Sequence, residues 1–225
     1  YFVFALPALI LVLYAQLKVK STYKRYLEVP NARGVSGLEA GRALLDSAGL
    51  WNVSIEGTPG ELTDNYDPRT NTLRLSAPVA RGRSVAALGI VAHEVGHAQQ
   101  DARGYPPLRV RSRLVPVVNL GTNLGYLFFI LGMLLRPLAG LIWVGIALFS
   151  LGVIFMLVTL PVEWNASGRA LAMLKTSGMV GEEELRGARR VLSAAALTYV
   201  AALAQTISTL LYYLFIAVGM RRRDD

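Results

Sequence analysis

Two histidines and one glutamate stand close together in the sequence, and their spacing is its strongest chemical signal. His93, Glu94 and His97 form the pattern H-E-x-x-H. On a helix, residues four apart lie on one face, one turn apart, so both imidazoles can bind a single metal ion. Glu94 would then lean toward the open coordination position and serve as general base and acid for a water whose pKa the metal lowers. The pattern predicts a catalytic metal site.

The composition makes this spacing more informative. The chain has 225 residues, only two histidines and no cysteine. Thiolate catalysis, cysteine-ligated metal sites and a disulfide framework are therefore excluded. Catalytic zinc needs a third protein ligand, which in this chain must be a carboxylate, because zinc is bound by Cys, His, Asp or Glu.

Several carboxylates could supply the third ligand. Glu163 stands out because it follows an apolar segment and lies between Val162 and Trp164, where a carboxylate is poorly solvated unless it is paired or metal-bound. The acidic run 182–184 is better explained as the start of a helix, where the helix dipole favours negative charge. The candidates on the same side of the predicted membrane include Asp64, Asp67, Asp101, Glu163, Glu182, Glu183 and Glu184.

Four apolar segments are long enough to cross a bilayer, which takes about 20 mostly apolar residues in a helix. They are residues 1–17, the two halves of a hairpin at 114–160, and 194–220, followed by a tail at 221–225. An even number of spans places the polar region 18–113 and the segment 161–193 on one side of the membrane. These two regions hold most of the 23 Lys and Arg residues. The positive-inside rule therefore predicts that the metal site faces the cytoplasm.

The net charge of +8 is explained by this topology, and no basic run interleaved with aromatic residues indicates nucleic-acid binding. The lipid bilayer is the expected partner.

Within the spans, Gly121 and Gly125 form a small-xxx-small pair that would let two helices approach closely. The polar side chains in the spans are expected to face the bundle interior, as packing and interhelical hydrogen-bonding groups or, alternatively, as the lining of an ion path: Asn119, Asn123, Gln205 and Thr206.

The region between the first two spans reads as a small folded unit. Ser36 and Glu39 form a capping box ahead of a short helix that ends at Gly49. Three short segments at 52–56, 61–66 and 72–76, separated by turn residues, favour a small antiparallel β meander. Ser84 is the predicted N-cap of the helix that carries the histidines, and Gly104 closes it. The strand region could offer an edge to an extended peptide or be purely structural.

The chain resembles the YugP-like family of bacterial "putative neutral zinc metallopeptidases", which are integral membrane proteins. More distantly, it is similar to the membrane-bound metallopeptidases of the HtpX and CAAX-endoprotease type. The blocks that carry the resemblance are Leu62-Thr63-Asp64-Asn65-Tyr66-Asp67-Pro68, Ala92-His93-Glu94-Val95-Gly96-His97-Ala98, Leu114-Val115-Pro116 and Thr159-Leu160-Pro161-Val162-Glu163-Trp164-Asn165-Ala166-Ser167.

The resemblance implies one zinc ion, held by the two motif histidines and by Glu163 in a gluzincin-like set. The distant group carries an E-x-x-A-D pattern, so Ser167 takes the place of the aspartate that orients a ligand histidine there. A hydroxyl is a weaker partner than a carboxylate. Peptide hydrolysis also needs a donor for the oxyanion. The sequence does not select among Tyr66, Tyr105, Arg109, Arg113 and Tyr199, and the arginines at 109, 111 and 113 could simply face lipid phosphates.

Together these features predict a mainly α integral membrane protein with four transmembrane helices, a zincin-like helix and a small β meander. By resemblance, it is expected to be a zinc-dependent endopeptidase of the bacterial plasma membrane, acting on membrane-attached or unfolded polypeptides. One alternative is a catalytically silent zinc-binding scaffold that binds a partner, and another is a transporter that uses the polar residues of the bundle. A general-base glutamate inside the motif favours the enzyme, because a structural zinc site does not require one.

Overall fold

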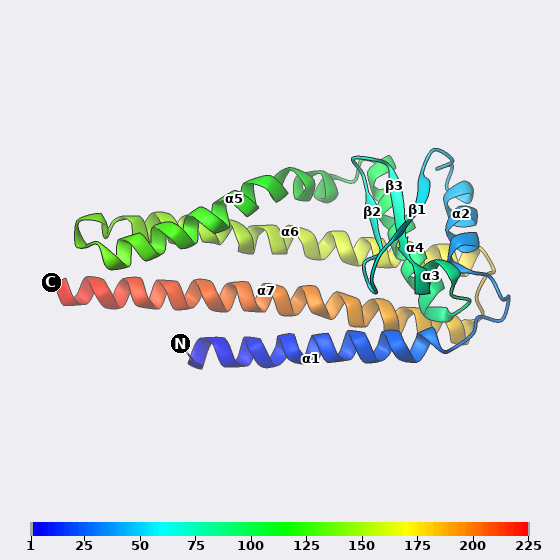
Figure 1. Ribbon diagram of the computed structural model, residues 1–225, viewed down its shortest axis with the longest axis horizontal. Coiled ribbons are helices and arrows are strands. Elements are labelled where there is room, and N and C mark those ends of the chain that lie inside the picture. The colour runs from blue at the N-terminus through cyan, green and yellow to red at the C-terminus, as the bar shows by residue number, and fades with distance from the viewer. Residues whose placement is uncertain (1, 225) are drawn as a thin grey trace.

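The computed structural model of the chain describes residues 2–224, without the side chains of residues 2–4, 136 and 221–224. Tyr1, which begins the first predicted span, and Asp225, which ends the predicted tail, lie outside the described residues. Four long helices run side by side, as Figure 1 shows: α1 (Phe2–Leu27), α5 (Pro106–Leu134), α6 (Leu141–Thr176) and α7 (Glu182–Asp224). All four are long and apolar enough to cross a membrane. The predicted mainly α class with four transmembrane helices is confirmed.

These helices are longer than the predicted spans, because they continue beyond the apolar segments into a compact end of the molecule (Figure 1). The most consequential extension is that of α6, which runs through Pro161 to Thr176. Glu163 therefore lies within a helix instead of in a loop that follows one. The tight connection predicted between the second and third spans is the short 3₁₀ helix η1 (Arg136–Leu138).

The compact end contains three shorter helices, α2 (Gly37–Ser47), α3 (Ala77–Arg81) and α4 (Val85–Ala102). The capping box before α2 is confirmed: the Glu39 backbone N–H donates to Ser36 Oγ, and Glu39 accepts from the Ser36 backbone N–H. The predicted cap of α4 is confirmed as well, since Ser84 Oγ accepts from the Ala87 backbone N–H. Local sequence signals therefore define where the helix that carries the histidines begins.

The sheet consists of β1 (Ser54–Thr58), β2 (Asn65–Asp67) and β3 (Thr72–Ser76) in the order β1-β3-β2. The predicted antiparallel meander is wrong in its pairing: β2 pairs antiparallel with β3, but β1 pairs parallel with it. Leu73 and Leu75 of β3 are almost fully buried, whereas β1 and β2 are more exposed. The strand with two inward-facing leucines takes the centre, and the other two become edges.

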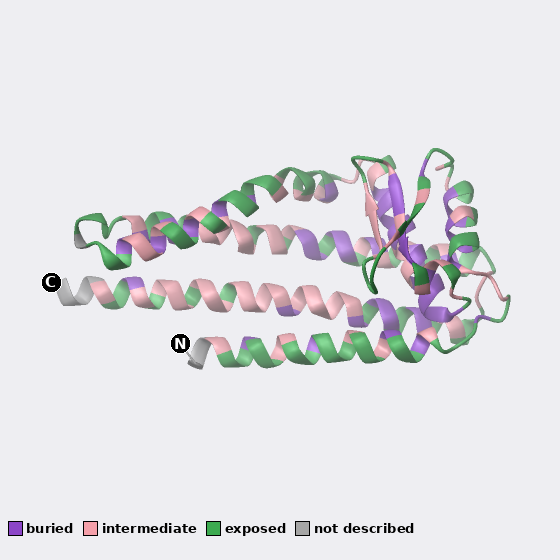
Figure 2. Ribbon diagram, viewed as in Figure 1, coloured by how far each residue is buried: buried purple, intermediate pink, exposed green. Residues whose placement is uncertain are grey.

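α4 forms the centre of the core, as the purple ribbon of Figure 2 shows at the compact end. It packs against α6, α7, α2 and the sheet, and its apolar residues from Val85 to Ala98 are nearly all inaccessible to solvent. Gly96 makes one of these contacts possible: a Cβ there would lie 2.6 Å from the Ala166 carbonyl oxygen of α6. The motif helix can approach the helix that carries Glu163 only because this position has no side chain.

In the long helices, Gly125 confirms the predicted close approach. A Cβ on Gly125 of α5 would lie 2.9 Å from the Gly145 carbonyl oxygen of α6. Gln205 and Thr206 are half-buried on α7, but Asn119 and Asn123 are exposed, so their predicted position inside the bundle is wrong. Each asparagine precedes a packed glycine by two residues, which is about 200° around a helix. The face that brings α5 against α6 therefore turns both amides outward.

Candidate metal centre

Helix α4 presents His93, Glu94 and His97 from its middle turns, close to α6 and the sheet. The two imidazole rings lie edge to face with their centroids 4.8 Å apart. Glu94 and His97 are each 9% exposed, so neither side chain is freely solvated. The helical spacing of four thus places both rings in one small region, as the sequence predicts.

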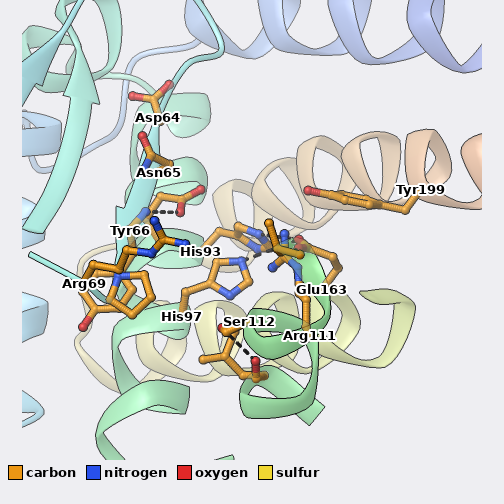
Figure 3. A pocket seen from close by; sticks show the side chains of 14 residues that line it. Asp64, Asn65, Tyr66, Arg69, His93, His97, Arg111, Ser112, Glu163 and Tyr199 are labelled. Atoms are coloured by element: carbon orange, nitrogen blue, oxygen red, sulfur yellow. Dashed lines mark hydrogen bonds and ion pairs between the residues drawn. The ribbon is translucent and has the colours of Figure 1, made fainter. Parts of the chain in front are cut away.

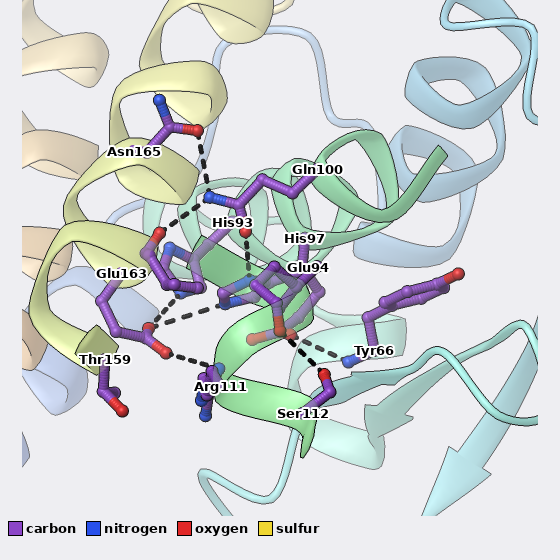
Figure 4. Close-up of polar contacts among 12 residues, drawn as sticks. Tyr66, His93, Glu94, His97, Gln100, Arg111, Ser112, Thr159, Glu163 and Asn165 are labelled. Carbon is purple, nitrogen blue, oxygen red and sulfur yellow. Dashed lines mark hydrogen bonds and ion pairs between the residues drawn. The ribbon is translucent and has the colours of Figure 1, made fainter. Parts of the chain in front are cut away.

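Glu163 of α6 completes the cluster from the facing helix (Figure 4). Its Oε2 atom lies 3.2 Å from His93 Nε2 and 3.5 Å from His97 Nε2, and its side chain is 2% exposed. One potential ligand atom from each of the three residues lies within 4.8 Å of the others. Two imidazole nitrogens and one carboxylate oxygen therefore converge from two helices, which is the donor set of a gluzincin-like zinc site.

The hydrogen bonds of Gln100 determine which nitrogen of His97 carries the proton. Gln100 Nε2 donates to the Val162 carbonyl oxygen at 2.8 Å and to Asn165 Oδ1 at 3.0 Å, so its Oε1 must be the atom 3.0 Å from His97 Nδ1. An amide oxygen can only accept, so His97 Nδ1 carries a hydrogen and Nε2 of the neutral ring has a lone pair.

That lone pair faces the Glu163 carboxylate, and two electron-rich atoms so placed repel each other unless a cation lies between them. The residues therefore fit a divalent metal ion. His93 is held in a similar way, since its Nδ1 lies 3.1 Å from Ser167 Oγ. The Ser167 hydroxyl can accept the hydrogen of Nδ1 and leave His93 Nε2 free to bind a metal.

The other oxygen of Glu163 is bound by an arginine. Arg111 Nη1 of α5 lies 3.2 Å from Glu163 Oε1, which leaves Oε2 facing the histidines. A buried carboxylate is costly unless it is paired, and here the arginine supplies the pairing. Arg109 and Arg113 are the expected donors among the three arginines, but Arg111 is the one that reaches the site.

Glu94 lies beside this cluster and is oriented by the sheet. Its Oε2 accepts a hydrogen bond of 2.9 Å from the backbone N–H of Tyr66 in β2. Burial raises the pKa of Glu94 to about 7, and the nearby Glu163 charge also raises it, against an opposing effect of His93. A carboxyl group with a pKa in this range can both accept and release a proton near neutral pH.

Two cavities meet at these residues. The first, of about 320 Å³, opens between the sheet and α5 and is lined by the side chains drawn in Figure 3. The second, of about 260 Å³, lies between α1, α4 and α7, and its walls are mainly apolar, including Ile90, Val191 and Ala195. His93, Glu94, Glu163 and Tyr199 line both. The cluster can therefore be reached from a polar side and from an apolar side.

The residues predicted as oxyanion donors do not all reach the cluster. Tyr199 extends from α7 toward the histidines in Figure 3. Tyr66 contributes its backbone, but its hydroxyl bonds Asn71 and Asp101 instead. Tyr105, Arg109 and Arg113 line neither of the two cavities at the cluster.

The alternative third ligands do not join the cluster within the described part of the chain. Asp64 lines both cavities but accepts hydrogen bonds from Ser76, and Asp67 pairs with Arg74. Asp101 accepts from Tyr66, and Glu183 pairs with Arg186. Two residues of the site, Gln100 and Asn165, were not expected from the sequence. Helical spacing could have revealed Gln100, because it is three residues after His97 and so lies on the same face.

The chain is similar to known proteins along almost its whole length. Residues 1–218 match the family described as "Putative neutral zinc metallopeptidase". The protein "Putative membrane protease YugP" of Bacillus subtilis (strain 168) is 45% identical over 220 residues, which cover 98% of this chain and 96% of that protein. No solved structure matches the chain.

Proposed function

Because the chain belongs to the family of putative neutral zinc metallopeptidases, we propose that it is a membrane-bound zinc-dependent endopeptidase. The observation that carries the proposal is the convergence of His93, His97 and Glu163, with potential ligand atoms within 4.8 Å of one another and Glu94 beside them. His93 Nε2, His97 Nε2 and Glu163 Oε2 would hold one zinc ion. When bound, zinc supplies Lewis acidity, which makes a water more acidic and a peptide carbonyl more electrophilic.

Glu94 moves the proton in this proposal. It accepts a proton from the attacking water and then donates it to the amine that leaves when the C–N bond breaks. The Tyr66 backbone N–H holds one carboxylate oxygen of Glu94, so the other oxygen is available to the water. The raised pKa suits a group that must first be a base and then an acid within one turnover.

Two side chains would stabilise the developing oxyanion. Tyr199 was one of the candidates from the sequence, and Arg111 adds a positive charge; both line the polar cavity. A guanidinium has five N–H donors, so Arg111 can bind Glu163 Oε1 and still donate to a second acceptor. We assign Arg111 a second role, which is to hold Glu163 so that Oε2 faces the histidines.

The substrate is proposed to be an extended polypeptide with apolar side chains, either membrane-attached or unfolded. β2 is an edge strand of the sheet, and Asn65 and Tyr66 line the polar cavity beside Glu94. An extended peptide could add to that edge, while an apolar side chain enters the second cavity between α4 and α7. Folded soluble proteins would not reach such a site, and their efficient cleavage would contradict this proposal.

The chain is an integral membrane protein, as its four apolar helices and its membrane-protease relative indicate. We propose that the metal centre faces the cytoplasm of a bacterial plasma membrane, since the Lys and Arg residues concentrate at the compact end. A reporter fused after residue 225 tests this orientation. Its signal should come from outside the cytoplasm. A cytoplasmic signal from that fusion would reverse the orientation.

The decisive experiment measures metal content by mass spectrometry together with cleavage of an unstructured fluorogenic peptide. The detergent-purified wild type should contain one zinc per chain and cleave the peptide. Glu94→Gln should keep zinc and lose cleavage, whereas Glu163→Ala should lose both. Zinc retained in Glu163→Ala would mean that another residue is the third ligand. Zinc without turnover in the wild type would instead support the zinc-binding scaffold.

A further inference from the structure

Four cationic side chains line one cavity between α1 and α7, and none of them lines the cavities at the metal centre. This cavity has a volume of about 360 Å³, and the hydroxyl-bearing Thr22 and Ser193 also line it. No Asp or Glu is among its lining residues. The four cationic residues are Lys18 and Arg25 of α1 and Arg189 and Arg190 of α7. A cavity lined in this way favours a ligand with negative charge.

Acidic side chains of the described residues do not neutralise these charges, because none of their ion pairs includes any of the four. Arg190 Nη1 instead donates to the Tyr26 hydroxyl at 2.9 Å, and the Arg25 guanidinium lies 5.7 Å from the centroid of the same ring. Glu183 interacts electrostatically with Arg190, but its carboxylate is hydrogen-bonded to Arg186. Tyr26 thus positions two cations without removing their charge.

The same two helices form a second, mainly apolar cavity nearer the N-terminus of α1. Its lining includes Pro7, Ala8 and Leu11 of α1 and Ala204, Ile207 and Leu211 of α7. Leu11 precedes Lys18 by seven residues, and Ala204 follows Leu197 of the cationic cavity by seven. Seven residues are about two helical turns, or roughly 10 Å, so the two cavities lie along the same faces of both helices.

The position of this groove relative to the apolar spans indicates the kind of ligand. The four cationic residues lie just outside the predicted spans 1–17 and 194–220, and the residues that line the apolar part lie within them. A small soluble anion would use only the first part. An amphiphile with an anionic head and a hydrocarbon chain would use both, and the bilayer contains such molecules.

We infer that the groove between α1 and α7 binds an anionic membrane phospholipid. Its phosphate would lie among Lys18, Arg25, Arg189 and Arg190, and one acyl chain would run along Leu11 and Ala204 toward Leu211. The inference does not depend on the proposed peptidase activity, because no residue of the metal centre takes part in it. A bound lipid would tie α1 to α7, the helix that also carries Tyr199.

Native mass spectrometry of the full chain, purified in detergent, tests this inference. The protein is incubated with equal amounts of dioleoylphosphatidylglycerol and dioleoylphosphatidylcholine, and the bound lipid is counted. The test variant is Lys18→Gln with Arg25→Gln. The matched control is Lys20→Gln with Lys24→Gln, which removes the same charge from exposed positions of α1 that line neither cavity of the groove.

The wild type and the control should each retain one phosphatidylglycerol in preference to phosphatidylcholine, and the test variant should retain at least fivefold less. Ala204→Phe, which fills the apolar part without changing charge, should also reduce binding. An equal loss in both double variants would mean that only the overall charge matters and would overturn the site. Displacement of the lipid by millimolar inorganic phosphate would show a soluble-anion site and overturn the lipid assignment.

Discussion

The two ends of the molecule use apolar residues in different ways. At the compact end, protein surrounds α4, and residues such as Val91 and Ala92 are completely inaccessible to solvent. Along the long helices, large apolar side chains such as Leu120 and Leu157 stay exposed on the protein surface, as the green segments of Figure 2 illustrate. In the membrane, lipid would cover these side chains, so the chain need not supply a second layer of protein there.

This contrast explains where the candidate metal centre is located. A carboxylate or an imidazole among lipid-facing side chains would be costly and without partners. At the compact end, the protein provides both burial and hydrogen bonds, so Glu163 can be 2% exposed and still contact Arg111 and two histidines. The long helices anchor the molecule, and the compact end forms the site.

The largest effect is expected for the proposed proton carrier. Glu94→Gln should lower kcat/KM by about 10²-fold to 10⁴-fold, the usual contribution of a general base, while zinc content is unchanged. Peptide cleavage assays and metal analysis of the same sample check this. The comparison variant at the other end is Asn123→Ala, which changes an exposed amide of α5 and should leave both quantities as in the wild type. A similar loss of kcat/KM in both variants would contradict the assignment of catalysis to the compact end.

Two leucines on α6 test the contrast in burial directly. Leu174 is 0% exposed at the compact end, and Leu157 is 54% exposed among the long helices. Leu174→Ala should lower the free energy of unfolding by about 2–5 kcal/mol, since it leaves a cavity in a packed core. Leu157→Ala should change it by only about 0.5 kcal/mol or less. Unfolding in detergent by denaturant measures both, and equal effects would contradict the contrast.

The approach of α4 to α6 is tested by a smaller change. Gly96→Ala should destabilise the protein by about 1–3 kcal/mol and weaken zinc binding, because the new Cβ would meet the Ala166 carbonyl oxygen. Gly168→Ala on α6 is the matched control, since a Cβ there would meet nothing within 4 Å. Thermal unfolding with and without added zinc distinguishes the two. Equal stability of both variants would mean that the close contact is not required.

The smallest effect is expected for the residue that orients a histidine. Gln100→Leu removes the acceptor of His97 Nδ1 and should weaken zinc binding by about 10-fold to 100-fold. Ser167→Ala should have a smaller effect on the same measurement, because a hydroxyl is a weaker partner than an amide oxygen. Competition with a chelator quantifies zinc affinity in both. A larger loss in Ser167→Ala would show that His93, not His97, depends more on its partner.

Much of the compact end was predictable, because its signals are local. The caps at Ser36 and Ser84 and the helical spacing of His93 and His97 act within a few residues, so a short stretch of sequence contains all that they require. The pairing of β1 was not predictable in this way. It depends on which strand buries its side chains against α4, and Leu73 and Leu75 decide this only when the helix is in place.

The sequence by itself determined the chemical groups of the candidate site and the class of fold: H-E-x-x-H in a chain with two histidines and no cysteine, four apolar segments, and a carboxylate at position 163 beside one of them. The tertiary structure alone decided which arginine meets Glu163, which nitrogen of His97 is free, and which of the candidate tyrosines line the polar cavity. The physical reason is the distance along the chain over which each interaction acts. Helical spacing and hydrophobicity act along the chain, whereas an ion pair between α5 and α6 depends on how closely glycines such as Gly125 let those helices approach.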